Sequence, residues 1–197
     1  NVGGVSGGVL FLDSASADHG TFIFEGDNIA NNVYFGNLQV GGFCTMANAT
    51  FTIGGGTASD AFGANASIGG MATCADAVFT INGGTADGAT GGSLNLQSGT
   101  TSFPSCANAT FIVNGGSNGG GGGTIYFLDS GGPPPDGGKA RIELFGSGSL
   151  DLSQLPKPLV TGSVEGDGIV FLGGTNLKVG SRNVDTVFSG LLQDGGF

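Results

Sequence analysis

The fold is decided by the stretch TMANATFTIGG, residues 45–55, because it recurs twice further along the chain. The copies are TCADAVFTING, residues 73–83, and SCANATFIVNG, residues 105–115, and a looser copy, ADHGTFIF, occupies residues 17–24. One phenylalanine anchors each copy, and successive anchors are 29, 28 and 32 residues apart. The anchors are Phe22, Phe51, Phe79 and Phe111. Such a period is typical of repeat proteins in which each unit packs only on its neighbours.

A second element alternates with the first. It reads GVLFLDS at residues 8–14, GSLNLQS at residues 92–98 and GTIYFLDS at residues 123–130. Each unit of about 30 residues thus holds two or three short strands between glycine-rich corners, which predicts one coil of a parallel β-solenoid. Equivalent strands would pair in parallel, and the four anchor phenylalanines would form a structural ladder inside. An antiparallel β-sandwich also has short strands, but it does not require the same residue at the same place in each unit.

The composition also favours an all-β fold. The chain has 197 residues, of which 43 are glycine, 15 are phenylalanine and only 10% are charged. The glycines lack the three-residue period of collagen, and low charge with many apolar residues is the opposite of a disordered chain. Helical periodicity is almost absent, and Gly-Gly pairs interrupt the short apolar runs. We therefore expect glycine-rich corners between the strands.

We predict a single continuous solenoid over residues 1–197, with repeat units of about 30 residues over residues 1–130. Residues 131–138, GGPPPDGG, contain three prolines that cannot donate ladder hydrogen bonds, so we predict a protruding Pro/Gly loop insertion there. Neither a signal peptide nor a run of about 20 apolar residues is visible. We expect a mature or excised segment with no membrane insertion of its own.

The charge is acidic and unevenly distributed. The formal net charge is −10, and residues 1–138 contain nine acids and no base. The remaining residues contain six acids and five bases. Because phosphate contacts need Lys and Arg, nucleic acid is not an expected partner. Acidic, lysine-poor composition is common in extracellular bacterial repeat proteins, and we expect an extracellular or bacterial cell-surface location.

The C-terminal third carries the most recognisable pattern. It contains ARIELFGSGSLDL at residues 140–152, GSVEGDGIVFLG at residues 162–173 and VFSGLLQDGG at residues 187–196. Together with the preceding repeats, these segments resemble the passenger-associated repeat region of bacterial autotransporter-like proteins. The resemblance implies a right-handed parallel β-helix displayed outside the cell, with passenger-associated-repeat-like coils over residues 139–197. It implies no single activity, because passengers include adhesins, stalks, proteases and esterases.

No catalytic residue is predicted. GVSGG, residues 4–8, matches the Gly-x-Ser-x-Gly nucleophile elbow, but no helix follows it, and His19 is the only histidine that could act as its base. Four acids could supply a glycosidase pair, namely Glu143, Asp151, Glu165 and Asp167. However, sugar-cleaving sites usually add aromatic platforms, and the chain has no Trp and two Tyr. We expect solvated acids at coil corners and no enzymatic activity.

The cysteines and the sequons fall on the repeat. Cys74 and Cys106 occupy equivalent positions, so they would stack on neighbouring coils, either as a disulfide or as buried free thiols. Three asparagines match the N-glycosylation sequon: Asn48, Asn65 and Asn108. Because the first and last are repeat-equivalent, a hydrogen-bonded asparagine ladder explains them without sugar. Zinc-type and EF-hand spacings do not occur, so no metal or cofactor is predicted.

These patterns predict an extracellular structural protein, a β-solenoid subunit of a cell-surface stalk or self-assembling filament. Residues 9–12 and 187–192 look like ordinary strands, without a polar cap. Uncapped strands expose unpaired backbone, which favours head-to-tail self-association. The alternative is an adhesin passenger that binds a surface glycan or host protein through the prolines at 133–135 and the glycine-rich loops. A polysaccharide-degrading enzyme is the least favoured alternative.

Overall fold

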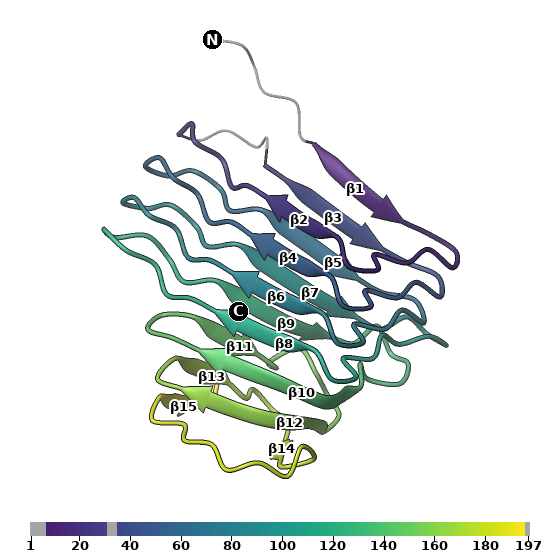
Figure 1. The fold of residues 1–197 in the computed structure, drawn as a ribbon. Coiled ribbons are helices and arrows are strands. Elements are labelled where there is room, and N and C mark those ends of the chain that lie inside the picture. Colours follow the sequence, from purple (N-terminus) through teal and green to yellow (C-terminus); the bar gives the residue numbers. More distant parts are fainter. Residues whose placement is uncertain (1–6, 31–34, 196–197) are drawn as a thin grey trace.

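The chain forms a parallel β-solenoid in the computed structural model, which describes residues 7–30 and 35–195 (Figure 1). All regular structure in these residues is β-strand, and each coil contributes to an eight-stranded and a seven-stranded sheet. The eight-stranded sheet consists of β1 (Gly8–Phe11), β3 (Asn37–Val40), β5 (Asn65–Ile68), β7 (Ser93–Gln97), β9 (Thr124–Leu128), β11 (Ser149–Asp151), β13 (Ile169–Phe171) and β15 (Leu191–Gln193). The seven-stranded sheet consists of β2 (Thr21–Phe24), β4 (Thr50–Ile53), β6 (Val78–Ile81), β8 (Thr110–Val113), β10 (Gly137–Leu144), β12 (Leu159–Gly166) and β14 (Leu177–Val179).

Every strand pair is parallel, and the repeats keep one register. The four anchor phenylalanines are aligned in β2, β4, β6 and β8. Their rings stack with centroids 5.1, 4.8 and 5.3 Å apart and with interplanar angles of 12°, 10° and 21°. Ile142 of β10 occupies the next position of this ladder. The predicted parallel β-solenoid is confirmed, and the antiparallel sandwich is excluded.

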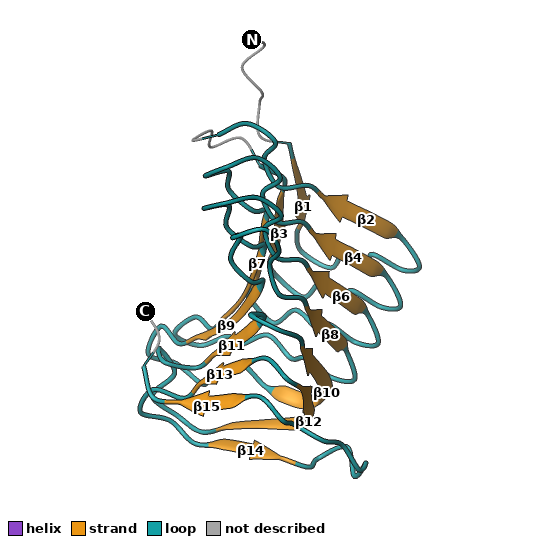
Figure 2. Ribbon diagram, turned by 90° about the vertical axis from the view of Figure 1, so that its left-hand side faces the viewer, coloured by secondary structure: helices purple, strands orange, loops and turns teal. Residues whose placement is uncertain are grey.

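The core lies between the two sheets, which Figure 2 shows as separate layers of stacked strands. Burial alternates along the strands: in β6, Phe79 and Ile81 are buried while Val78 and Thr80 lie half-buried on the outer face. This period of two is expected for a strand with one face toward the core. The opposite wall repeats as well, so the core is a stack of similar layers rather than a set of unrelated contacts.

A third line of parallel contacts runs between the sheets, at one corner of each of the first five coils. Isolated bridges join Ser16, Thr45, Thr73, Ser105 and Asp136. Each of these side chains accepts a hydrogen bond, 3.0–3.3 Å long, from the backbone N–H two residues further on. The donors are Asp18, Ala47, Ala75, Ala107 and Gly138, whose φ angles lie between 47° and 56°. Such local side-chain-to-backbone bonds are typical of turns, and here they redirect the chain into the seven-stranded sheet.

The loops that lead from the seven-stranded to the eight-stranded sheet are long in the first half of the chain. Residues 54–64, 82–92 and 114–123 form such loops, which stack on one another (Figure 1). A Cβ added to Gly55 would lie 2.2 Å from the carbonyl oxygen of Gly83. Glycine therefore allows the loops to approach each other closely, which explains much of the glycine content.

The proline segment differs from the insertion predicted at residues 131–138. Its last two glycines belong to β10, because the chain rejoins the third line of contacts at Asp136. The preceding coil makes the same connection with residues 98–104, a segment as long as residues 129–135. The prolines thus occupy a corner that is lengthened in two successive coils, and the interval of 32 residues between the last two anchors has the same origin.

Candidate ligand-binding groove

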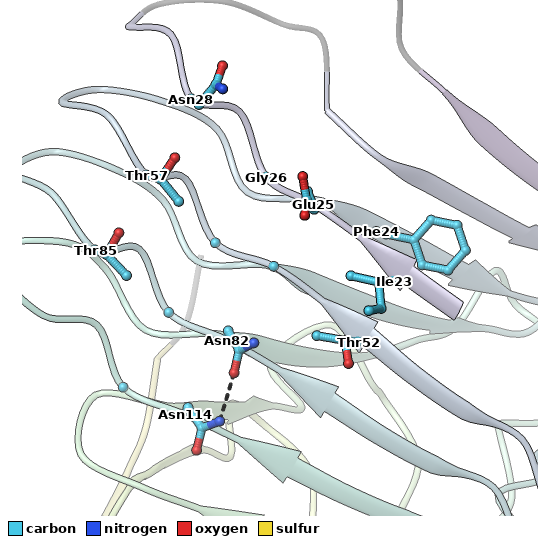
Figure 3. A pocket seen from close by; sticks show the side chains of 14 residues that line it. Ile23, Phe24, Glu25, Gly26, Asn28, Thr52, Thr57, Asn82, Thr85 and Asn114 are labelled. Atoms are coloured by element: carbon cyan, nitrogen blue, oxygen red, sulfur yellow. Dashed lines mark hydrogen bonds between the residues drawn. The ribbon is translucent and has the colours of Figure 1, made fainter. Parts of the chain in front are cut away.

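A groove runs along the solenoid axis beside the ends of β2, β4, β6 and β8 (Figure 3). Its volume is about 530 Å³, and four successive coils line it. Because each coil brings the same repeat position to the surface, equivalent side chains recur along the groove. The side chains labelled in Figure 3 are Ile23, Phe24, Glu25, Asn28, Thr52, Thr57, Asn82, Thr85 and Asn114.

One side of the groove is a column of residues that directly follow the strands. Beyond the first coil, the backbone N–H of each donates to the final strand residue of the preceding coil, at 2.8–2.9 Å. This groove column consists of Glu25, Gly54, Asn82, Asn114 and Phe145. The phenylalanine lies one coil beyond the described lining of the groove, and the residue is 40% exposed. The column therefore ends on an exposed aromatic ring.

Asn82 and Asn114 form an amide pair within this column. Nδ2 of Asn114 donates to Oδ1 of Asn82 at 2.9 Å, as Figure 3 shows. Among the described residues this is the only hydrogen bond that either side chain makes. A primary amide has two hydrogens and two lone pairs, so Nδ2 of Asn82 and Oδ1 of Asn114 retain bonding capacity. The pair offers a donor and an acceptor to a ligand, one coil apart.

The rest of the lining is polar but almost uncharged. Thr57 and Thr85 are exposed and equivalent in successive coils, and Thr52 lies on the outer face of the adjacent strand. Glu25, at the N-terminal end, is the only ionisable side chain among the described lining residues. The groove can therefore form many neutral hydrogen bonds, but it has no cation for an anionic ligand.

A cluster of three charged side chains, Arg141, Glu143 and Glu165, lies on the outer face of β10 and β12. Nε of Arg141 lies 3.2 Å from Oε1 of Glu143 and donates a hydrogen bond to Glu165. This hydrogen bond with Glu165 is the main reason why the pKa of Arg141 is raised. Burial of the guanidinium lowers the pKa, and the negative charges of Glu143 and Glu165 raise it further. The cluster links two coils electrostatically and separates the neutral face of the first coils from the C-terminal ones.

The acids considered for glycoside hydrolysis are not brought together as a set. Glu143 and Glu165 are engaged with the arginine on the seven-stranded sheet. Asp151 is buried in the eight-stranded sheet and accepts the backbone N–H of Ser153 at 2.8 Å, whereas Asp167 accepts that of Gly146 at 2.9 Å.

The serine elbow can be compared with the structure only in part. Residues 4–6 lie outside the described residues. His19, the only histidine, is exposed and lies 2.9 Å from the neighbouring carboxylate of Asp18. The histidine therefore belongs to a corner turn of the first coil.

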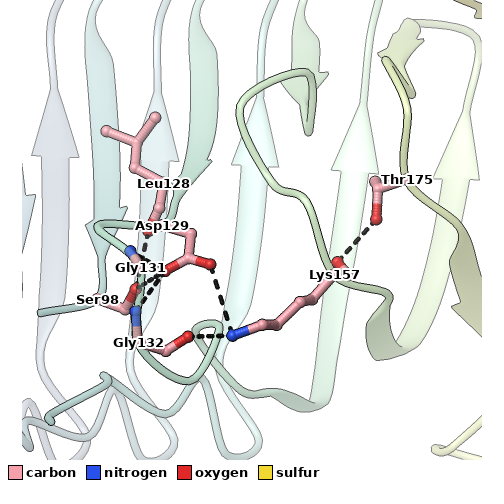
Figure 4. Close-up of polar contacts among 7 residues, drawn as sticks. All are labelled: Ser98, Leu128, Asp129, Gly131, Gly132, Lys157 and Thr175. Carbon is pink, nitrogen blue, oxygen red and sulfur yellow. Dashed lines mark hydrogen bonds and ion pairs between the residues drawn. The ribbon is translucent and has the colours of Figure 1, made fainter. Parts of the chain in front are cut away.

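The lengthened corner carries an acid with a buried carboxylate, Asp129 (Figure 4). The Asp129 side chain is 1% exposed; its Oδ1 accepts bonds from Ser98 and from the backbone N–H groups of two following glycines. Nζ of Lys157 lies 3.9 Å from Oδ2 and donates to the carbonyl of Gly132. Thr175 in turn donates to the carbonyl of Lys157 at 2.7 Å. These contacts connect successive coils through side chains.

All three cysteines are buried free thiols. Cys74 directly follows the bridging residue Thr73, and Cys106 directly follows Ser105, so these two thiols stack on successive coils. Cys44 instead precedes its bridging residue, Thr45. The neighbouring Cys74 thiol, followed by burial, raises the pKa of Cys106 well above the ordinary thiol value. Of the two arrangements that the sequence left open, the structure has the stacked thiols.

The three sequon asparagines lie in two different environments. Asn48 and Asn108 are exposed at corners, and Nδ2 of Asn108 donates to Oδ1 of Asp76, the equivalent residue one coil earlier, at 3.1 Å. Asn65 lies on the outer face of β5, where its Nδ2 donates to Oγ of Ser93 at 2.9 Å. The corner position thus has one cross-coil hydrogen bond, between Asn108 and Asp76, and among the described residues the side chain of Asn48 makes none, so the hydrogen bonds do not form the asparagine ladder that the sequence suggested.

Within residues 7–30 and 35–195, no three His, Cys, Asp or Glu side chains are grouped so that they could hold a metal ion. No helix in this part of the chain has the length and apolar character needed to cross a membrane. Comparison with protein-family models, curated proteins and solved structures finds no match to this chain.

The groove was not predicted from the sequence. The signal was present in the Asn-Gly pairs at 82–83 and 114–115, which follow equivalent strands. Asn-Gly is first of all a turn signal, so these residues indicated corners rather than a binding surface. Phe145 gave no signal, because its place in the column depends on how coils of different lengths align.

Proposed function

We propose that the chain is a structural segment of an extracellular β-solenoid that forms a cell-surface stalk or filament. The observation that carries the proposal is the unbroken parallel pairing from β1 to β15 and from β2 to β14. Such pairing produces a stiff rod whose length grows with each coil. Support also comes from the resemblance to autotransporter-like passengers and from the acidic, lysine-poor composition.

The edges of the rod support self-association. Val9 of β1 is 37% exposed and Leu192 of β15 is 57% exposed, although both align with buried residues of the neighbouring strands, Leu38 and Val170; β1 and β15 form the two edges of the eight-stranded sheet. Edge strands present unpaired N–H and C=O groups that template a further strand. Because the two edges differ, β15 of one copy would pair in parallel with β1 of the next, and such heterologous contacts build an open fibre.

Light scattering and negative-stain electron microscopy of the purified chain test this assembly. We expect mass that increases with concentration and rods longer than one molecule. The double variant Val9→Lys/Leu192→Lys should stay monomeric, because both positions face the core side of the sheet and a buried charge at each junction opposes pairing. Phe43→Lys is the control, because Phe43 is 71% exposed at a corner and outside both edges. A wild-type chain that stays monomeric at all concentrations would show that the filament is wrong.

A further inference from the structure

We propose that the groove binds a neutral, unbranched polysaccharide that lies along the solenoid axis, a function beyond the structural role. The geometry of the repeat is the first argument. Parallel strands, and hence equivalent groove residues, are spaced by about 4.8 Å. One residue of an extended β-linked glycan advances by nearly the same distance. Consecutive sugars can therefore meet equivalent side chains on consecutive coils, which a globular ligand could not do.

The chemistry of the lining selects this class of ligand. The amide pair of Asn82 and Asn114 and the hydroxyl of Thr85 supply donors and acceptors that match sugar hydroxyls, and the Thr57 hydroxyl, which donates to the carbonyl of Asp27, supplies an acceptor. Anionic polymers are disfavoured, because Glu25 is the only ionisable group among the described lining residues and the chain has a formal net charge of −10. A nucleic acid would need the cationic side chains that this lining lacks.

Phe145 provides the apolar contact that sugar recognition requires. It follows Asn114 in the groove column, and the residue is 40% exposed. The C–H face of a pyranose ring packs well on an aromatic ring, which adds dispersion and hydrophobic contact to the hydrogen bonds. The groove column thus combines a stacking platform with an amide pair on the neighbouring coils. This site is distinct from the proline corner at 133–135, but it includes glycines of the glycine-rich loops, which the sequence also suggested as adhesive contacts.

A peptide strand is a poorer fit to the groove. Strand addition requires a free sheet edge, whereas the backbone N–H groups of Gly54, Asn82 and Asn114 are already bonded to the preceding coil. Recognition must therefore come from the side chains that line the groove, which are arranged one after another along the axis. A neutral glycan needs only such side chains, because its own hydroxyls supply the complementary donors and acceptors.

Retention on insoluble polysaccharides, followed by calorimetry with the matching hexasaccharide, tests the proposal. The panel consists of swollen cellulose, β-1,3-glucan, xylan and mannan, with cross-linked polygalacturonate as the anionic comparison. We expect retention on at least one neutral polymer and not on polygalacturonate. Asn82→Ala/Asn114→Ala and Phe145→Ala should each weaken hexasaccharide binding by about tenfold. Thr85→Arg, at an exposed position, should block the groove without touching the core.

Asn95→Ala is the matched control, because Asn95 lies half-buried on the outer face of the eight-stranded sheet and should leave binding unchanged. Thermal unfolding by circular dichroism verifies that each variant is folded. The proposal is overturned if no neutral polymer retains the chain, if polygalacturonate retains it equally, or if folded Thr85→Arg binds like the wild type. It is also overturned if Asn95→Ala weakens binding as much as the groove variants do.

Discussion

Alanine adopts a left-handed backbone conformation at three equivalent corner positions. Ala47, Ala75 and Ala107 have φ angles of 49°, 50° and 47°. For a residue with a Cβ this conformation costs about 1–2 kcal/mol. The hydrogen bond from each of these N–H groups to a Thr or Ser side chain two residues earlier offsets part of that cost. The side chain at the bridging position therefore determines the turn, although its neighbour is not a glycine.

Replacing Ala75 by glycine should stabilise the protein by about 0.5–1 kcal/mol, because glycine adopts positive φ without steric strain. Ala77→Gly is the control: Ala77 is fully buried with ordinary φ, so the same change should destabilise by about 1 kcal/mol. Urea unfolding of both variants measures the difference. Equal destabilisation by the two substitutions would contradict the strained-turn interpretation.

The Cys106 thiol links stability to pH. Its pKa is raised in the folded protein, so the folded state favours the protonated thiol. Its contribution to stability is present in full below the pKa of the unfolded thiol, about 8.5, and is lost as the pH rises through the folded pKa. In reducing buffer, the free energy of unfolding should therefore fall above about pH 8.5. Cys106→Ala should show a shallower decline in urea titrations between pH 7.5 and 10, and parallel curves would refute this linkage.

At the scale of elements, the glycine loops depend on close contact between the backbones of successive coils. A Cβ on Gly83 would lie 2.4 Å from the carbonyl oxygen of Gly115, and the φ angle of Gly83 is ordinary. The glycine is thus required by crowding and not by backbone conformation. The same reasoning applies to Gly26 and Gly55, which precede it in the loop stack.

Gly83→Ala should destabilise the protein by about 1–3 kcal/mol, because the loops must separate to accommodate the methyl group. Gly41→Ala is the matched control: its Cβ would meet only a side-chain atom of Leu12 at 3.7 Å, an ordinary contact. That change should be neutral within about 0.5 kcal/mol or slightly stabilising. The melting temperatures of Gly83→Ala and Gly41→Ala measure the difference. Equal melting temperatures would exclude crowding as the reason why position 83 requires glycine.

At the scale of the whole molecule, each coil packs mainly on the coils before and after it, and the segment after β14 also reaches β10, where Ser181 and Arg182 donate to the carbonyls of Gly138 and Lys139. Stability in such a rod is close to a sum of coil and interface contributions. The neutral groove and the stacked rings lie within residues 22–115, whereas all five basic residues lie at or beyond residue 139. The N-terminal and C-terminal coils therefore share one fold but differ in surface chemistry.

Backbone hydrogen exchange should reflect this one-dimensional construction. Under monomeric conditions, amides of β1, β2, β14 and β15 should exchange first, and those of β5 to β9 last, because the central coils have neighbours on both sides. Mass spectrometry of exchanged peptides measures the order. At concentrations that permit assembly, β1 and β15 should become protected. Uniform protection of all strands in the monomer would instead indicate a single cooperative unit.

The sequence by itself determined the parallel solenoid, its register over the first four coils and the phenylalanine stack. It could do so because parallel strands align identical positions, and the repeat marks those positions with the same residues. The proline corner was predicted as an insertion at residues 131–138; the lengthened segment covers residues 129–135 and recurs in the preceding coil, which contains no proline run to reveal it. The stacked thiols were one of two arrangements that the sequence left open.

Only the tertiary structure decided which surface positions form one site. Aligned strand partners lie 28 residues apart between Asn65 and Ser93 but only 20 apart between Ser149 and Ile169. With such variation, sequence spacing could not place Phe145 beside Asn114 or Lys157 beside Asp129. The physical reason is that backbone pairing sets the alignment of coils, while loop length is free to vary between them. The core could thus be predicted from the repeat, but the groove and the contacts between Lys157 and the Asp129 corner could not.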